Sequence, residues 1–184
     1  KLTLDTTPPD APPLVWPADG ENINGNTLTV DWNAVPDAST PVLYRCYVDN
    51  DANFLSVDHD SGWTAATEYT TPELAEGVWY WRVQAKDNAG NVGDNSSRSF
   101  RVDVTKPTTP SNVSPVNGEN TNDNTPLLDW SDSTDVSLPI TYNLYVDNDS
   151  NFSSVDYTQT SLTSSQYQFL SELAEKVWYW RVQA

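Results

Sequence analysis

The sequence predicts an all-β protein of two tandem β-sandwiches, and two observations carry this prediction. The octapeptide VWYWRVQA occurs twice, at residues 78–85 and 177–184, and the segments around it repeat as well, so that Trp32 matches Trp130. A repeat of about 100 residues has the size of one immunoglobulin-sized sandwich, whereas solenoid units span about 20 to 50 residues. Apolar residues in the repeated segments alternate with period 2, and no segment keeps a helical period.

Each repeat opens with a proline-rich segment that begins at Asp5 or Asp103. Prolines at this density favour extended backbone and remove ladder donors, which is typical of a stiff joint leading into an edge strand. The next element is a half-buried strand, because Leu28, Val30 and Trp32 point to one side and the residues between them are polar. The second copy keeps the same phase.

A further strand is predicted at residues 44–49 and again at 142–147, and each ends in the turn YVDND. A fourth strand carries Tyr69 or Tyr167. The octapeptide is the central strand of each sandwich, and its alternation predicts four inward side chains in the first copy: Trp79, Trp81, Val83 and Ala85. A loop that begins KDNAGN leads to a last strand with Phe100 and Val102 inward. We expect Trp32, Trp81, Trp130 and Trp180 to be buried.

The composition excludes several classes of protein. Acidic residues outnumber basic ones 26 to 9, giving a net charge of -17 that would repel nucleic acid and anionic lipid. The surplus is typical of a well-solvated surface in a salty or calcium-containing medium, or of cation binding. One Cys and one His exclude an intrachain disulfide and a Cys/His zinc cluster, and Cys46 is expected to be a small buried hydrophobe. No apolar run of about 18 residues suggests a membrane span.

A Trp on the second strand, the YVDND turns, the WYWRVQA strand followed by KDNAGN, and the proline-rich joint together point to a family. The whole chain resembles the fibronectin type III-like (immunoglobulin-like) repeats of bacterial and archaeal cell-surface proteins and of secreted polysaccharide-degrading enzymes. The resemblance implies two tandem immunoglobulin-like sandwiches located outside the cell or on its surface. The family commonly has Tyr where this sequence has Trp79 and Trp178.

The ends of the sequence predict the domain boundaries. Residues 1–5 match the last strand of the first repeat, with Leu2 and Leu4 in place of Phe100 and Val102, so they are expected to belong to a preceding or neighbouring sandwich. The first sandwich then spans 6–104, and the second spans 105–184 without a last strand. The chain is either an excerpt of a longer array or a fibre subunit whose N-terminal strand fills the next subunit's open edge.

Catalysis is not expected. His59, the only imidazole, is matched by Tyr157 in the second repeat, and no G-x-S-x-G motif is present. The carboxylates fall in turns or on outward strand faces, where solvent leaves them with ordinary acidity. We therefore predict a non-enzymatic chain without a required cofactor.

Calcium is the one metal that the sequence suggests. The YVDND turns contain the pattern D-x-D-x-N, which supplies oxygen ligands at the first positions of a calcium loop. The six residues are Asp49, Asp51, Asn53, Asp147, Asp149 and Asn151. The glycine at the sixth position is missing, and the twelfth position holds Asp60 in one copy and Thr158 in the other. The alternative is that Asp and Asn cap these turns. The proline-rich joint is a second place where calcium is expected.

Two further features concern glycans. Trp16 and Trp63 could stack on sugars, but the second repeat has Ser114 and Ser161 in their places. N-glycosylation acceptor motifs stand at Asn95, Asn112, Asn148 and Asn151.

The sequence thus predicts an extracellular spacer, stalk or filament subunit, joined head to tail by donor-strand complementation in the fibre alternative. The other function left open is an accessory or carbohydrate-binding module of a secreted polysaccharide-degrading enzyme. The expected partners are neighbouring copies or repeats of the same protein, or polysaccharide, and neither nucleic acid nor a membrane interior is expected to be one.

Overall fold

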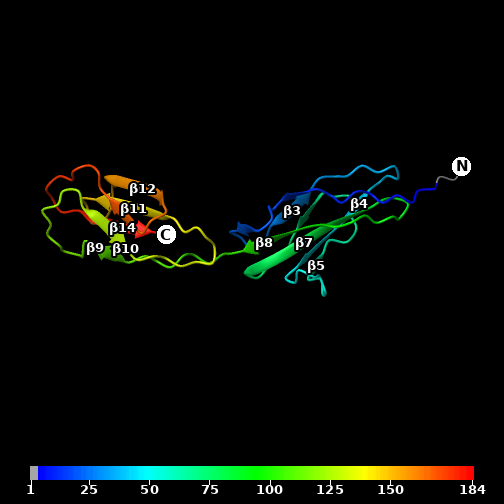
Figure 1. Ribbon diagram of the computed structural model, residues 1–184, viewed down its shortest axis with the longest axis horizontal. Helices are drawn as coiled ribbons and strands as arrows, with labels where there is room; N and C mark the ends of the chain where they lie inside the picture. The colour runs from blue at the N-terminus through cyan, green and yellow to red at the C-terminus, as the bar shows by residue number, and fades with distance from the viewer. Residues whose placement is uncertain (1–3) are drawn as a thin grey trace. The chain divides into compact units, whose positions relative to one another are not determined.

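The structure is a computed structural model that describes residues 4–184, and these residues form strands and loops throughout (Figure 1). The chain divides into two compact units, Lys1–Val104 and Thr105–Ala184, which we call unit 1 and unit 2. The described residues contain no helix long and apolar enough to cross a membrane. The all-β class predicted from the alternation is confirmed.

Unit 1 consists of two sheets. The smaller sheet has the order β1 (Leu14–Trp16), β3 (Thr29–Trp32) and β6 (Glu68–Thr70). The larger sheet has the order β2 (Glu21–Ile23), β8 (Ser96–Val102), β7 (Gly77–Lys86), β4 (Leu43–Asp49) and β5 (His59–Asp60). Only β2 and β8 run parallel; the other pairs are antiparallel.

The core of unit 1 lies between these sheets, on the faces that the alternation assigns to the inside. Successive side chains of a strand point to opposite faces, so one apolar set per strand is buried. The four predicted inward residues of β7 are all at most 7% exposed, and Trp81 is completely covered. Phe100 and Val102 of β8 and Cys46 of β4 lie in the same cluster. The inward phase predicted for the first octapeptide is therefore correct.

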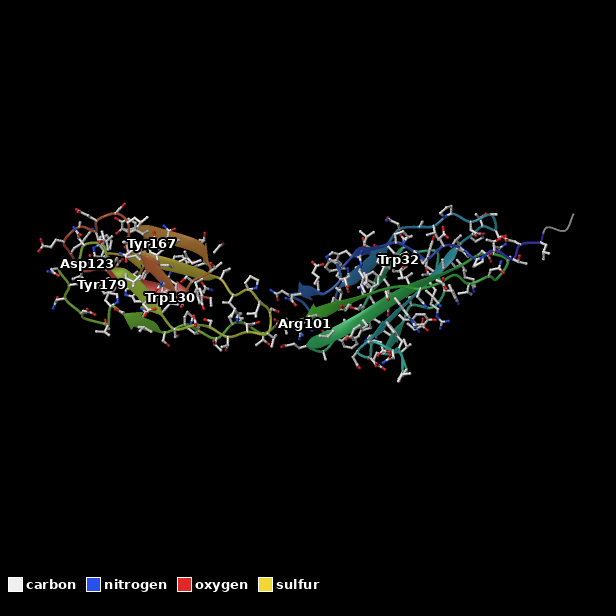
Figure 2. All side chains as sticks on the ribbon, in the orientation of Figure 1. Trp32, Arg101, Asp123, Trp130, Tyr167 and Tyr179 are labelled. Carbon is white, nitrogen blue, oxygen red and sulfur yellow. The ribbon has the colours of Figure 1, made fainter. Side chains whose placement is uncertain are left out.

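Unit 2 repeats this plan with six strands. One sheet has the order β13 (Gln166–Gln168), β10 (Leu127–Trp130) and β9 (Asn112–Ser114). The other has the order β12 (Tyr157–Leu162), β11 (Tyr142–Asp147) and β14 (Tyr179–Gln183). Trp130 of unit 2 and Trp32 of unit 1, both labelled in Figure 2, are buried in their respective cores.

The second octapeptide forms a shorter strand than the first, and this corrects one expectation. Strand β7 lies between β4 and β8, whereas β14 pairs with β11 alone. Trp180, which matches the buried Trp81, is only partly buried. The prediction of a buried Trp180 was wrong because the burial of this side chain requires a neighbouring strand on both edges.

Each unit has a Trp where the family commonly has the Tyr of a tyrosine corner. The indole Nε1 of Trp79 donates to the carbonyl of Ala75 at 2.8 Å, and Trp178 Nε1 donates to the carbonyl of Ala174 at 3.0 Å. In a tyrosine corner the phenol makes the same kind of bond to backbone a few residues upstream. The indole therefore provides the corner bond in both units.

Candidate cation and ligand sites

The YVDND turn of unit 1 is a pair of successive Asx turns. Asp49 is the last residue of β4 and is 1% exposed, and its Oδ1 accepts the backbone N–H of Asp51 at 2.9 Å. Asp51 Oδ1 accepts both the backbone N–H and the side-chain amide of Asn53, at 3.0 and 3.1 Å. Phe54, with φ 53°, then turns the chain back. The three predicted ligand residues are thus engaged with one another.

Unit 2 builds the same turn from the matching residues. Asp147 Oδ1 accepts the N–H of Asp149 at 3.1 Å, and Asp149 Oδ1 accepts the N–H and side-chain amide of Asn151 at 3.0 and 3.2 Å. Ser153 Oγ also donates to Asp149 Oδ2 at 2.6 Å. The structure therefore brings the six predicted ligand residues together as two local turns.

These bonds set the acidity of the exposed carboxyls. The backbone N–H of Asn53 holds the pKa of Asp51 below its usual value, and the Ser153 hydroxyl does the same for the pKa of Asp149. A carboxylate that accepts several N–H or O–H bonds is stabilised in its charged form. The second oxygen of Asp49 and that of Asp147 are buried without a hydrogen-bond partner. Calcium binding at these turns stays a prediction.

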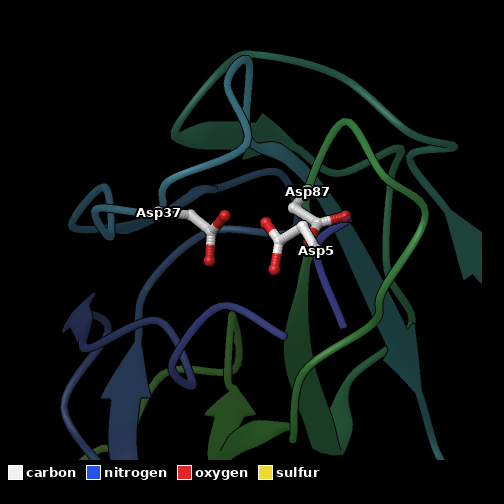
Figure 3. Close-up of side chains that lie close together, drawn as sticks. All are labelled: Asp5, Asp37 and Asp87. Atoms are coloured by element: carbon white, nitrogen blue, oxygen red, sulfur yellow. The ribbon is translucent and has the colours of Figure 1, made fainter. Parts of the chain in front are cut away.

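Three other carboxylates lie close together at one end of unit 1 (Figure 3). Asp5 comes from the proline-rich segment, Asp37 from the loop between β3 and β4, and Asp87 from the residue after β7. One oxygen of each lies within 4.8 Å of the others. Three convergent carboxylates match the oxygen ligands that calcium takes in proteins.

Neighbouring polar groups hold this cluster in place. Asn91 donates to Asp87 through its backbone N–H at 2.8 Å and its side-chain amide at 2.7 Å, and the same amide reaches the Asp5 carbonyl at 3.2 Å. Ser39 donates its N–H to Asp37 Oδ1 at 2.8 Å and its hydroxyl to Asp5 Oδ2. Burial raises the pKa of Asp87, but the bonds from Asn91 outweigh it and the pKa lies below its usual value.

Sequence reasoning placed calcium at the YVDND turns or the proline-rich joint between the two domains, and it did not name Asp5, Asp37 or Asp87 as ligands. The repeat offered part of the signal, because Asp103 and Asp135 stand where Asp5 and Asp37 stand in unit 1. Asp135 also accepts the N–H of Ser137 at 2.7 Å, as Asp37 accepts that of Ser39. Asp87 is far from Asp5 and Asp37 in sequence, so its role is visible only in the folded unit 1.

The predicted interface strand is described only in part, since Leu2 lies outside the described residues. Leu4 is 83% exposed and belongs to no strand. Asp5, next to it, is bonded to unit 1 through Asn91 and Ser39. A pairing of residues 1–5 with another sandwich stays a prediction.

All four N-glycosylation motifs have an exposed Asn. The amides of Asn112, Asn148 and Asn151 donate to Trp180 O, Asp156 Oδ2 and Asp149 Oδ1. A glycan attached to any of these three side chains would replace an amide hydrogen that now lies in a hydrogen bond. The side-chain amide of Asn95 makes no hydrogen bond to a described residue.

Cations lie over aromatic rings on the outward face of the larger sheet of unit 1. The guanidinium carbon of Arg45 lies 5.1 Å from the ring centre of Tyr47 and 6.0 Å from that of Trp63. Arg82 lies 5.1 Å from the ring centre of Tyr47, and the Lys86 amine lies 4.3 Å from that of Trp63. Trp63, one of the two candidate sugar-stacking residues, is thus covered by Arg45 and Lys86.

The remaining candidates show local structural contacts. Trp16 donates its indole N–H to Glu21 Oε1 at 3.3 Å. His59 lies on β5 with its ring centre 5.8 Å from that of Trp79. The imidazole packs beside an aromatic corner of the fold.

Comparison with known proteins identifies the fold. No family model matches the sequence, and no curated protein matches it. Among solved structures, the fibronectin(III)-like modules of CbhA from Clostridium thermocellum align over 87% of this chain and 78% of theirs, with 14% identity and a TM-score of 0.53. The FN1–FN3 domains of chicken CNTN1 align over 95% of this chain and 62% of theirs, with 13% identity and a TM-score of 0.47.

Proposed function

Because the fold is that of tandem fibronectin type III-like modules, we propose that the chain is a non-catalytic structural repeat outside the cell, acting as a spacer, stalk or filament element. Two sandwiches on one plan, joined by a proline-rich segment, suit a protein that spans distance. The acidic surface suits a solvated, extracellular setting. A fold of this kind hosts many activities, so the proposal must rest on a particular feature of this chain.

That feature is the edge of β14. In unit 1 the corresponding edge of β7 is covered by β8, with Trp79 opposite Phe100 and Gly77 opposite Val102. In unit 2 the described pairing of β14 is with β11 only. An edge with unpaired N–H and C=O groups beside partly buried aromatic residues is a template for another strand. We propose that β14 receives a strand from a neighbouring copy or repeat.

Residues 1–5 have the pattern that this edge requires. If Leu2 and Leu4 take the places that Phe100 and Val102 hold in unit 1, Leu2 lies opposite Trp178 and Leu4 opposite Lys176. Main-chain bonds would supply the affinity, and the alternate apolar side chains the register. A contact between residues 1–5 of one copy and unit 2 of the next is heterologous, so it generates an open filament where the rotation between copies does not close into a ring.

The size of the full chain in solution tests this proposal. We expect oligomers that grow with concentration, and protection from hydrogen exchange in those oligomers of the β14 amides that do not already bond to β11. The variant Leu4→Asp should stay monomeric, and Leu55→Asp, at an equally exposed position, should assemble normally. Monomers at every concentration, with free exchange of the β14 amides that face away from β11, would contradict the donor strand, and so would assembly that Leu4→Asp leaves intact.

A second function, the accessory or carbohydrate-binding module of a secreted polysaccharide-degrading enzyme, is favoured by one observation. Tyr47, Phe54 and Trp63 gather on one face of unit 1, interleaved with cations. Aromatic side chains are common in carbohydrate-binding sites, but here cations occupy the ring faces. Any sugar recognition on this surface must therefore use the charged groups.

A further inference from the structure

One arginine in each unit is clamped between two aromatic rings. Arg82 lies 4.2 Å from the ring centre of Phe54 and 5.1 Å from that of Tyr47. Arg181, its counterpart in unit 2, lies 4.5 Å from the ring centre of Phe152 and 5.2 Å from that of Tyr145. We call this pair the clamped arginines. The rings come from the strand next to the arginine and from the YVDND turn, so the turn itself builds the clamp.

Arg45 shows what an arginine stacked in this way can bind. It lies over Tyr47 and Trp63, and its Nε and Nη2 donate to the two oxygens of Asp60, at 2.9 and 2.5 Å. Stacking fixes the plane of a guanidinium, and the fixed plane suits the two oxygens of a carboxylate. A bidentate carboxylate is therefore compatible with the stacked geometry on this sheet.

The clamped arginines have no such carboxylate. Arg45 forms an ion pair with Asp60, whereas no carboxylate of a described residue is hydrogen-bonded to Arg82 or Arg181, although the chain has 26 acidic residues. Neither guanidinium donates a hydrogen bond to a described residue; the Nε of Arg82 is buried without an acceptor, whereas Arg181 is exposed. The exposed guanidinium of Arg181 is open to an acceptor from solution. Both units thus present an oriented, unneutralised guanidinium.

The surroundings add charge and space for a ligand. Lys86 and Arg101 lie on the same outward face as Arg82, because β7 and β8 alternate around the inward Trp79 and Phe100. In unit 2 a cavity of about 290 Å³ is lined by Tyr145, Arg181, Val182 and Gln183. Small-molecule sites begin near this size. The clamped arginine of unit 2 therefore borders a hollow in the surface.

We propose that Arg82 and Arg181 are a duplicated binding site for the carboxylate of a uronic acid residue in an acidic glycan. The centres of two aromatic rings lie within 5.2 Å of each guanidinium carbon, so a carboxylate bound by the guanidinium lies near both rings. In a uronate the carboxylate is attached to the sugar ring, whose C–H groups then meet those aromatic edges. A carboxylate on a flexible Asp or Glu side chain would lose more rotamer freedom on binding.

The net charge of -17 opposes this binding only at long range. Repulsion between exposed charges is largely screened beyond about 8 Å at physiological ionic strength, whereas the guanidinium contact is made at hydrogen-bond distance. A short uronate oligomer should thus bind at moderate salt. The inference does not depend on the spacer function, since a stalk and an accessory module can both carry such a site.

Titration calorimetry of the full chain with trigalacturonate tests the proposal, with its neutral methyl ester as a matched ligand. We expect two sites for the acid and no binding of the ester. Arg82→Lys keeps the charge but loses the two parallel N–H donors of the guanidinium, so it should weaken one site about tenfold or more. Arg181→Lys should weaken the other site in the same way. Arg101→Lys, on the same face but over no ring, should bind normally.

The native-like burial of Cys46 and the amide protection of β11 show whether each variant remains folded. Four results would overturn the proposal. They are no binding of the acid, equal binding of the ester, unchanged affinity in the double variant Arg82→Lys/Arg181→Lys, and tighter binding of a tri-aspartate peptide. The last result would assign the clamped arginines to an acidic protein partner.

Discussion

The two copies of VWYWRVQA have identical residues and different environments. In unit 1 the octapeptide forms the centre of β7, which is paired on both edges, and its Trp79, Trp81 and Val83 are at most 7% exposed. In unit 2 the ordered strand shrinks to Tyr179–Gln183, paired on one edge, and Trp178, Trp180 and Val182 are only partly buried. The pattern of the octapeptide determines which side chains face inward. Neighbouring strands determine how completely they are covered.

The largest difference between the units should appear when the matching core Trp residues are removed. Trp81→Ala should lower the free energy of unfolding of unit 1 by about 3–5 kcal/mol, because it empties a fully packed site. Trp180→Ala should cost unit 2 clearly less, since water already reaches that side chain. Denaturant unfolding would be followed by thiol labelling of Cys46 for unit 1 and by hydrogen exchange of β11 for unit 2. Equal costs would contradict the comparison.

Calcium would sharpen the comparison through the three-carboxylate cluster of unit 1. If calcium binds Asp5, Asp37 and Asp87, it stabilises unit 1 by about 2.7 kcal/mol at a hundred times the dissociation constant. Asp87→Asn should remove the effect, whereas loss on Asp51→Asn instead would place the ion at the YVDND turn. Identical melting of unit 1 in calcium and in chelator would reject both places.

The indole corner bonds allow a smaller, matched test. Trp79→Phe and Trp178→Phe each remove the donor to a backbone carbonyl, Ala75 or Ala174. Loss of the donor to a partly buried carbonyl costs up to about 1–3 kcal/mol. We expect that cost in unit 1 and less in unit 2, where Trp178 is only partly buried and water can replace the donor. Thermal unfolding with the same two reporters measures it, and a larger loss in unit 2 would be the contrary result.

The smallest expected effect is a difference in acid sensitivity. The hydrogen bond from Arg45 lowers the folded-state pKa of Asp60 below its usual value. The resulting stabilisation is present above the unfolded-state pKa and is lost as the pH falls through the folded-state pKa. The pair is partly exposed, so we expect about 0.2–1 kcal/mol. Unit 2 has Asn143 and Thr158 in these places. Asp60→Asn should therefore reduce the loss of unfolding free energy between about pH 5 and pH 2 in unit 1 only. Cys46 labelling across this pH range measures it.

The repeat and the alternation were sufficient to predict the strands that carry the cores, because both signals are local in sequence. Trp32, Trp81 and Trp130 are buried as their phase indicates. The fate of Trp180 was not predictable in this way, since it depends on whether another strand lies beside β14. Local pattern specifies the face of a strand, and tertiary pairing specifies its coverage.

The sites were less predictable than the strands. The D-x-D-x-N pattern correctly located two turns, but an Asx turn and a cation loop begin with the same residues. Asp5 and Asp87 are far apart in sequence and meet only because the proline-rich segment folds against the loop after β7. The clamp on Arg82 depends on the positive φ of Phe54, which returns the ring over the sheet. Neither contact can be predicted from a repeat or an alternation in the sequence.

The two identical octapeptides also pose a problem during synthesis, because either copy could pair with β4. A ribosome adds about 5–20 residues per second, so the second copy emerges roughly 5–20 s after the first. Sandwiches of this size fold within about milliseconds to seconds. By then β7 is enclosed between β4 and β8, and the later copy finds β11 as its free partner. The order in which the chain is made thus assigns each copy to its own unit.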